Sequence, residues 1–147
     1  MEIIDYTGKI NNHEKYIEIL DKIKEKCEYI EIVIINGRKN NELVNKFSKD
    51  ILEQRKVCEW WGSKTCSKNN LYKIKTSNEL FSYLMNYETF CKYYEYGSNQ
   101  KSLSRGEYSE ITNFGIDDIA FYDKNDNYIL FTTTHEGYIS ISDNIIE

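Results

Sequence analysis

The sequence has no run of apolar residues long enough to cross a membrane. A transmembrane helix needs about 20 consecutive apolar residues, whereas the longest strongly apolar run here, residues 30–35, is short and is interrupted by Glu31. The N-terminal segment carries acids at positions where a signal peptide has basic residues. We therefore expect a cytoplasmic protein that makes no membrane contact.

The sequence also lacks the motifs of common enzyme and metal sites. It contains no phosphate-binding loop, dinucleotide-binding fingerprint, serine nucleophile elbow or paired-histidine zinc motif. Its four cysteines form no closely spaced pair, and only His13 and His135 are available to complete a metal site. The lack of a concentrated basic stripe and the net charge of −5 argue against direct nucleic-acid binding. These absences favour a non-enzymatic protein without a metal ion or another cofactor.

The charged residues are distributed unevenly along the chain. Residues 107–147 contain nine acids and a single lysine, whereas residues 1–106 contain fifteen acids and eighteen bases. Charge of one sign gathered in one region steers encounters with partners of the opposite sign more than it stabilises a fold. The acidic last third therefore predicts a binding surface, provided that its acids gather into one patch. The alternative is a solvated acidic face that only keeps the protein in solution.

Hydrophobic periodicity predicts alternating strands and helices in the first two thirds of the chain. Apolar residues recur at helical spacing after Asn12, and a nearly continuous β-branched run follows them. The expected strands are at 2–6, at 30–35 in the centre of the sheet, and at 71–75. The expected helices run from Asn12 to about Cys27 and over 41–60. A third helix begins with the capping-box residues Thr76 and Glu79, has its apolar stripe from Leu80 to Tyr94, and is followed by a polar loop at 97–106.

The last third changes to the alternating pattern of β-hairpins. Three aromatic and β-branched runs, at 118–123, 128–134 and 138–142, are separated by turn residues. We predict a single α+β domain over residues 1–147, with about three helices packed on one mixed sheet that ends in a C-terminal antiparallel meander.

Residues 123–127 resemble the start of a calcium loop, because oxygen-bearing side chains alternate there. However, Tyr128 stands where such a loop requires glycine, and Thr134 stands where it requires glutamate. Asp and Asn also favour hairpin turns, since their side chains bond their own main chain. The sequence therefore predicts a turn at this position.

Two polar residues near the chain end, His135 and Glu136, form the most reactive-looking pair. A carboxylate can orient a histidine as a general base, but adjacent residues of a strand point to opposite faces. The polar end of a hairpin explains them equally well. The alternative to a binding function is thus a small enzyme or ligand-binding domain that uses His135 and Glu136, with Cys58 or Cys66, in a cleft.

Two adjacent tryptophans, Trp60 and Trp61, precede Gly62 and a polar loop. Tryptophan fills cores because of its large apolar surface. It is also enriched at the hot spots of protein interfaces. Either a core position or an exposed contact with a partner therefore fits each of them.

The last third of the chain resembles the immunity proteins of bacterial polymorphic toxin systems. The resemblance rests on residues 114–123 and 134–139, together with the small size and the lack of catalytic motifs. The composition also fits, because a proline-free chain rich in Lys, Asn, Ile and Tyr is typical of AT-rich bacterial genomes. The resemblance implies that the protein binds and blocks a cognate toxin domain, often a nuclease. An acidic sheet would then occupy the basic cleft of that toxin, where close charge pairs speed association.

We expect the partner-binding residues to lie in the acidic meander and at the tryptophan pair. The candidates are Trp60, Trp61, Asp117, Asp118, Tyr122, Asp123, Asp126, Tyr128, His135 and Glu136. A third possibility is a structural protein that associates with itself through an exposed sheet edge.

Overall fold

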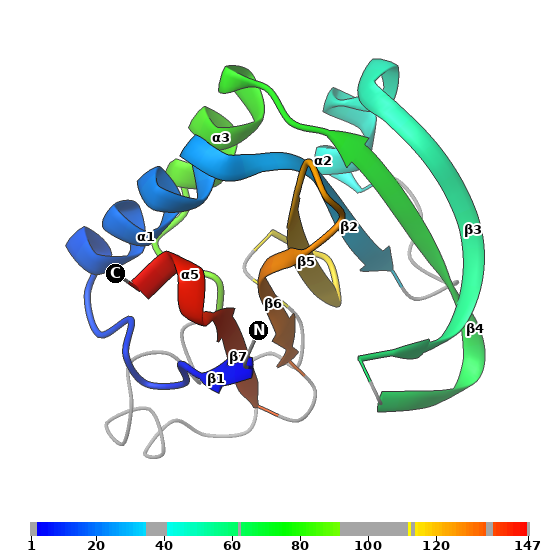
Figure 1. The fold of residues 1–147 in the computed structure, drawn as a ribbon. Coiled ribbons are helices and arrows are strands. Elements are labelled where there is room, and N and C mark those ends of the chain that lie inside the picture. Colours follow the sequence, from blue (N-terminus) through cyan, green and yellow to red (C-terminus); the bar gives the residue numbers. More distant parts are fainter. Residues whose placement is uncertain are drawn as a thin grey trace.

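The computed structural model describes residues 3–34, 41–61, 63–91, 112, 114–134 and 137–146. They form one seven-stranded sheet with helices on one face, as Figure 1 shows. The strands are β1 (Ile3–Asp5), β2 (Cys27–Ile34), β3 (Ile51–Trp60), β4 (Ser63–Lys75), β5 (Asp118–Asp123), β6 (Tyr128–Thr133) and β7 (Tyr138–Ser142). The helices are α1 (His13–Lys26), α2 (Glu42–Lys46), α3 (Asn78–Met85) and α5 (Asp143–Ile146), with a 3₁₀ turn at Ser48–Asp50. The predicted α+β class is confirmed.

The strand order is β1-β7-β6-β5-β2-β4-β3, and every pair within the described residues is antiparallel. The expected mixed sheet is therefore wrong in this detail. A parallel pair would arise if β3 lay directly beside β2. Instead, the β3–β4 hairpin places β4 between them, and β4 runs opposite to both neighbours.

The main core lies between the sheet and the helices. The apolar stripe predicted for α1 is buried, with Tyr16, Leu20 and Ile23 fully covered. It packs with residues of α3 and with the inward residues of the central strand β2. The hydroxyl of Tyr16 donates to the carbonyl oxygen of Leu84 at 2.6 Å, which ties α1 to α3. No helix of the described residues is long and apolar enough to span a membrane.

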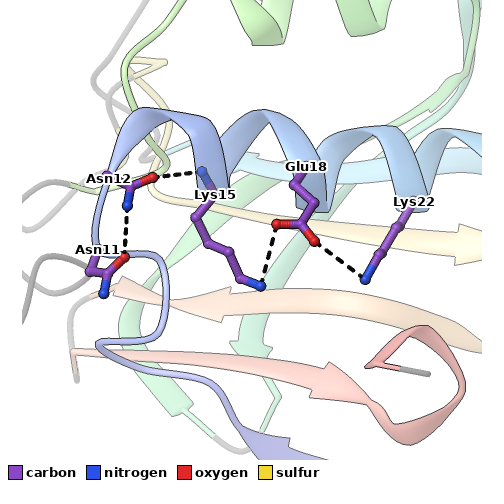
Figure 2. Close-up of polar contacts among 5 residues, drawn as sticks. All are labelled: Asn11, Asn12, Lys15, Glu18 and Lys22. Atoms are coloured by element: carbon purple, nitrogen blue, oxygen red, sulfur yellow. Dashed lines mark hydrogen bonds and ion pairs between the residues drawn. The ribbon is translucent and has the colours of Figure 1, made fainter.

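Helix α1 begins where the sequence predicts. The side-chain oxygen of Asn12 accepts a hydrogen bond from the amide of Lys15 at 2.8 Å (Figure 2). One turn later, Glu18 lies between Lys15 and Lys22, at 3.5 and 3.7 Å. These ion pairs are exposed, so they add little stability compared with the buried stripe.

Residues 51–60 are a strand, and the predicted helix at 41–60 is wrong beyond Lys46. Their side chains, including Gln54 and Arg55, favour helices, and Leu43 and Phe47 have helical spacing to Ile51. The pairing of β3 with β4 overrides this local preference. Strand β4 is correspondingly much longer than the predicted strand at 71–75, because it continues beyond its pairing with β2 and pairs with β3 back to Ser63.

The long β3–β4 hairpin bends toward the meander, as Figure 1 shows. Its tip closes over the face of the sheet opposite the helices, where Trp60 joins Val33, Leu71, Ala120 and Phe131 in a second, smaller core. The indole nitrogen of Trp60 donates to the carbonyl oxygen of Thr132 at 2.6 Å. The hairpin tip is therefore attached to β6.

The C-terminal meander has nearly the predicted bounds, since only the end of β6 differs by one residue. The β5–β6 turn forms because Asp123 Oδ1 accepts from the amides of Asn125 and Asn127, at 2.8 and 3.0 Å. Asp126 adopts the left-handed conformation there, with φ of 63°. The oxygen atoms of Asp123 thus serve the turn, as the sequence predicts.

Helix α3 is capped by Ser77, so the predicted Thr76 capping box is wrong by one residue. The amide of Leu80 donates to Ser77 Oγ at 3.1 Å. Thr76 Oγ1 lies 3.0 Å from the carbonyl oxygens of both Cys27 and Glu28, which commits this hydroxyl to the start of β2. The helix also ends at Met85, earlier than expected. Tyr94 and the predicted loop at 97–106 lie outside the described residues.

Replacing Ser77 with Ala should lower the free energy of unfolding by about 1 kcal/mol, because the Leu80 amide loses its acceptor. Ser77→Asn keeps a capping oxygen and should retain most of the stability. Urea unfolding followed by circular dichroism measures both. Equal stability of Ser77→Ala and the unmodified protein would contradict the assigned cap.

Candidate functional site

Aromatic side chains gather on the sheet face opposite the helices. The ring of Trp61 stacks on Phe131, with centroids 3.9 Å apart and an interplanar angle of 4°. It also lies 5.3 Å from the ring of Tyr128 and 6.3 Å from that of Tyr122. Tyr122 in turn stacks on Tyr29 at 4.9 Å. The rings of β2, β5 and β6 thus form one continuous aromatic cluster with the hairpin tip.

Trp61 occupies an unfavourable backbone conformation in this cluster. Trp60 pairs with Ser63, so Trp61 is the first of the two residues that connect the strands. Such turns commonly require a positive φ at the first position, where Asn, Asp and Gly are favoured, and Trp61 has φ of 46°. For an L-residue with a large side chain this conformation costs about 1–2 kcal/mol. Its side chain remains 37% exposed, whereas Trp60 is only 6% exposed.

Further exposed apolar residues lie on the same face. Phe131 pairs with Ser140, and Ser140 pairs with Asp5. Because side chains alternate along a strand, Tyr138 on β7 and Ile3 on β1 share the face of Phe131. They are 50% and 60% exposed. We call the group of Trp61, Tyr128, Tyr138, Ile3 and Asp5 the Trp61 surface.

Acidic groups border the Trp61 surface on two sides. Besides Asp5, which is part of this surface, Asp143 lies near Tyr128, where its carboxylate adds to the effect of burial in raising the pKa of that tyrosine. On the other side, Asp126 Oδ1 accepts from the hydroxyl of Tyr29 at 3.0 Å. Burial is the main cause that raises the pKa of Tyr29, and this carboxylate raises it further. The tyrosines are therefore neutral hydrogen-bonding groups at neutral pH.

The β3–β4 side of the same face carries cations. Arg55 lies 3.7 Å from Glu31 and also contacts Glu53. The ammonium group of Lys73 lies 4.1 Å from the centroid of the Tyr29 ring, a favourable cation–π contact. The face is therefore acidic beside the meander and mixed in charge beside the hairpin.

The acids of β5 do not gather into one patch. Asp117 and Asp118 lie at the start of this strand, whereas Asp123 and Asp126 lie at and beyond its end. A strand of this length separates them by about 17 Å. The continuous acidic sheet expected from the charge count is thus divided into two groups.

Asp118 serves the fold. Its Oδ1 accepts from Thr132 Oγ1 at 2.8 Å and from the amide of Thr134 at 2.7 Å. Burial raises the pKa of its carboxyl to about 6, although these hydrogen bonds act in the opposite direction. A carboxylate engaged in this way is a poor contact for a partner, so we retain neither Asp118 nor the buried Trp60 as a contact residue.

The residues of the enzymatic alternative are not brought together in the described part of the chain. His135, Glu136 and the side chain of Cys66 lie outside it, and Cys58 is exposed on β3. Burial raises the pKa of Cys27 to about 12, which keeps this thiol protonated. No group of three potential metal ligands occurs among the described residues.

A polar groove of about 580 Å³ between α2 and α3 was not foreseen from the sequence. Its lining residues are Glu42, Lys46, Asn78, Glu79, Ser82, Tyr83, Asn86 and Tyr87. They include no histidine or cysteine that would suit the enzymatic alternative.

Comparisons with family models, curated proteins and solved structures find no match to this chain.

Asp118 should make the stability of the fold depend on pH. Its pKa of about 6 in the folded protein lies above the ordinary value of 3.8, so the folded state binds a proton more tightly than the unfolded chain. The stability contributed through this group therefore rises as the pH falls from about 6 to about 4, by at most about 1.4 kcal/mol per pH unit.

Replacing Asp118 with Asn should raise the free energy of unfolding by about 1–2 kcal/mol near neutral pH, because the amide oxygen keeps both hydrogen bonds without a desolvated charge. The gain should shrink toward about pH 4, where Asp118 is itself protonated. Urea unfolding at several pH values measures it, with Asp21→Asn on the exposed side of α1 as the matched control. A variant that is less stable than the unmodified protein near neutral pH would contradict this account.

Proposed function

We propose that this chain is a non-enzymatic binding protein that holds a basic protein partner on the Trp61 surface. In line with its resemblance to immunity proteins, we assign the partner as a cognate bacterial toxin domain that this binding neutralises. The observation that carries the proposal is the exposed indole of Trp61, held in a turn position that disfavours it.

A tryptophan is a poor choice for this turn on structural grounds alone. Asn followed by Gly is the favoured pair for such two-residue turns, and Gly62 already supplies the second residue. The stack on Phe131 offsets the backbone cost, since aromatic pairs contribute about 0.5–1.5 kcal/mol beyond their buried area. A residue chosen only for the fold would not leave a third of its surface exposed, whereas a pre-positioned aromatic anchor is typical of a binding hot spot.

The surroundings of Trp61 favour a basic partner. Asp5, Asp126 and Asp143 lie around the aromatic cluster, and the last third of the chain holds a single lysine, Lys124. Charges at the rim of an interface speed association and select the partner, while buried aromatic anchors slow dissociation. In place of a continuous acidic sheet, the proposed interface has an aromatic centre that provides affinity. A discontinuous acidic rim steers the basic partner toward it.

The test is the binding of the purified protein to the toxin domain encoded next to its gene. We expect a one-to-one complex whose association rate falls as the salt concentration rises from about 50 to about 300 mM. Trp61→Asn should weaken binding by about thirtyfold or more, because truncating a hot-spot residue typically costs at least about 2 kcal/mol. Surface plasmon resonance measures both rates, and inhibition of the toxin measures neutralisation.

Trp61→Asn also separates binding from folding. Asn suits the turn, so its gain in backbone energy should compensate for much of the lost stack, and the free energy of unfolding should change by less than about 1 kcal/mol. Leu52→Asn removes an exposed apolar side chain outside the Trp61 surface and serves as the control for binding. Unchanged affinity of Trp61→Asn, or no complex with the toxin domain at any salt concentration, would refute the proposal.

A further inference from the structure

Strand β3 is a long exposed edge of the sheet. It is ten residues long, stands last in the strand order, and pairs only with β4 among the described residues. Most of its side chains are exposed. The strand at the other edge, β1, has only three residues. Because an edge strand presents backbone N–H and C=O groups that can template a further strand, β3 is the edge to which another chain can add.

We propose that β3 pairs with β3 of a second copy of this chain, antiparallel, with Gln54 at the two-fold axis. In such a dimer the two sheets join into one, and the axis runs perpendicular to the joined sheet. Directly opposed residues then point to the same face. One residue therefore faces its own copy, and its two neighbours oppose each other across the axis.

The charges of β3 favour this register over its neighbours, and a register centred on Val57, which would oppose Arg55 to Glu59, is disfavoured because β3 is irregular between Val57 and Glu59. A register centred on Glu53 or on Arg55 places two like charges directly opposite each other, which is unfavourable. One centred on Lys56 does the same and also opposes Glu53 to Glu59. The register centred on Gln54 instead places Glu53 opposite Arg55 of the second copy, and symmetry repeats this pair.

The two charged residues are already arranged for this contact within one chain. Glu53 and Arg55 pair with Lys73 and Leu71 of β4, two positions apart, so they lie on the same face of the sheet. They also contact each other. In the dimer, each of the four charges would have only opposite charges as its nearest neighbours within β3 and its copy.

Leu52, which is 56% exposed, lies next to this paired stretch, where β3 is irregular between Ile51 and Glu53. Among the residues that the structure describes, it is the large exposed apolar residue that lies outside the Trp61 surface. In the dimer it lies near Lys56 of the second copy, whose aliphatic stem can lie over an apolar neighbour. Charges on an edge usually keep other strands away; here they exclude the neighbouring registers and favour one self-pairing.

The test uses the full chain in sedimentation velocity experiments over about 1–300 µM, a range in which a weak two-fold dimer becomes populated. We expect a reversible dimer with twice the 17.5 kDa mass of the chain. Glu53→Arg and Arg55→Glu should each weaken dimerisation by about tenfold or more, because each turns both symmetric pairs from attractive to repulsive. An equimolar mixture of the two variants should dimerise, since the introduced arginine of one then faces the introduced glutamate of the other.

The mixing experiment also guards against misfolding. Arg55→Glu loses the contact with Glu31 within its own chain, so circular dichroism must first show that both variants are folded. Glu25→Arg, an exposed substitution of the same kind on α1, should dimerise like the unmodified protein. A protein that is monomeric over the whole range, a dimer that survives both charge reversals, or folded variants that stay monomeric when mixed would each overturn the proposal.

Discussion

The attachment of the β3–β4 hairpin tip to β6 is the contact on which one whole face of this molecule depends. It consists of the hydrogen bond from Trp60 to the Thr132 carbonyl and of the stack between Trp61 and Phe131. Some seventy residues separate the partners along the chain, so no local preference produces it. A buried hydrogen bond contributes about 1 kcal/mol and an aromatic pair a similar amount. Together with the burial of Trp60, they offset the left-handed backbone of Trp61.

This contact determines what the sheet face can do. Without it, the hairpin would extend away from the sheet and leave Val33 and Leu71 of the second core exposed. With it, the two tryptophans acquire different roles, because Trp60 ends a strand and points into that core while Trp61 occupies the turn above it. The exposed aromatic centre of the proposed interface is therefore a consequence of how the hairpin closes.

The sequence predicts local features well and long-range features poorly. The meander follows from the alternation of apolar and polar residues and from the hydrogen bonds that Asp123 accepts in the turn. Both act within a few residues of the chain. The region around Gln54 is misjudged because its helix-favouring side chains are overruled by pairing with β4, whose strand extends farther than its own pattern indicates. A sequence pattern such as Trp-Trp-Gly before a polar run could have indicated a hairpin turn, but only with β3 recognised as a strand.

The candidate site was predicted in its composition more than in its arrangement. Trp61, Tyr122 and Tyr128 do meet in one cluster. The acids were counted correctly, but a count contains no information about which oxygen atoms the fold uses. Asp118 stabilises the start of β5 through Thr132 and Thr134, a role that requires β6 to be placed beside it.

The two proposed surfaces use different parts of one hairpin, which has a geometric consequence. Gln54 lies seven residues before Trp61 on β3, a separation of about 23 Å along an extended strand. A partner on the Trp61 surface would therefore not cover the pairing edge, and a second copy on that edge would not cover Trp61. In the antiparallel dimer the hairpin tips point in opposite directions, so the joined sheet presents two Trp61 surfaces. Each surface would then be open to a partner of its own, whether or not the edge strands are paired.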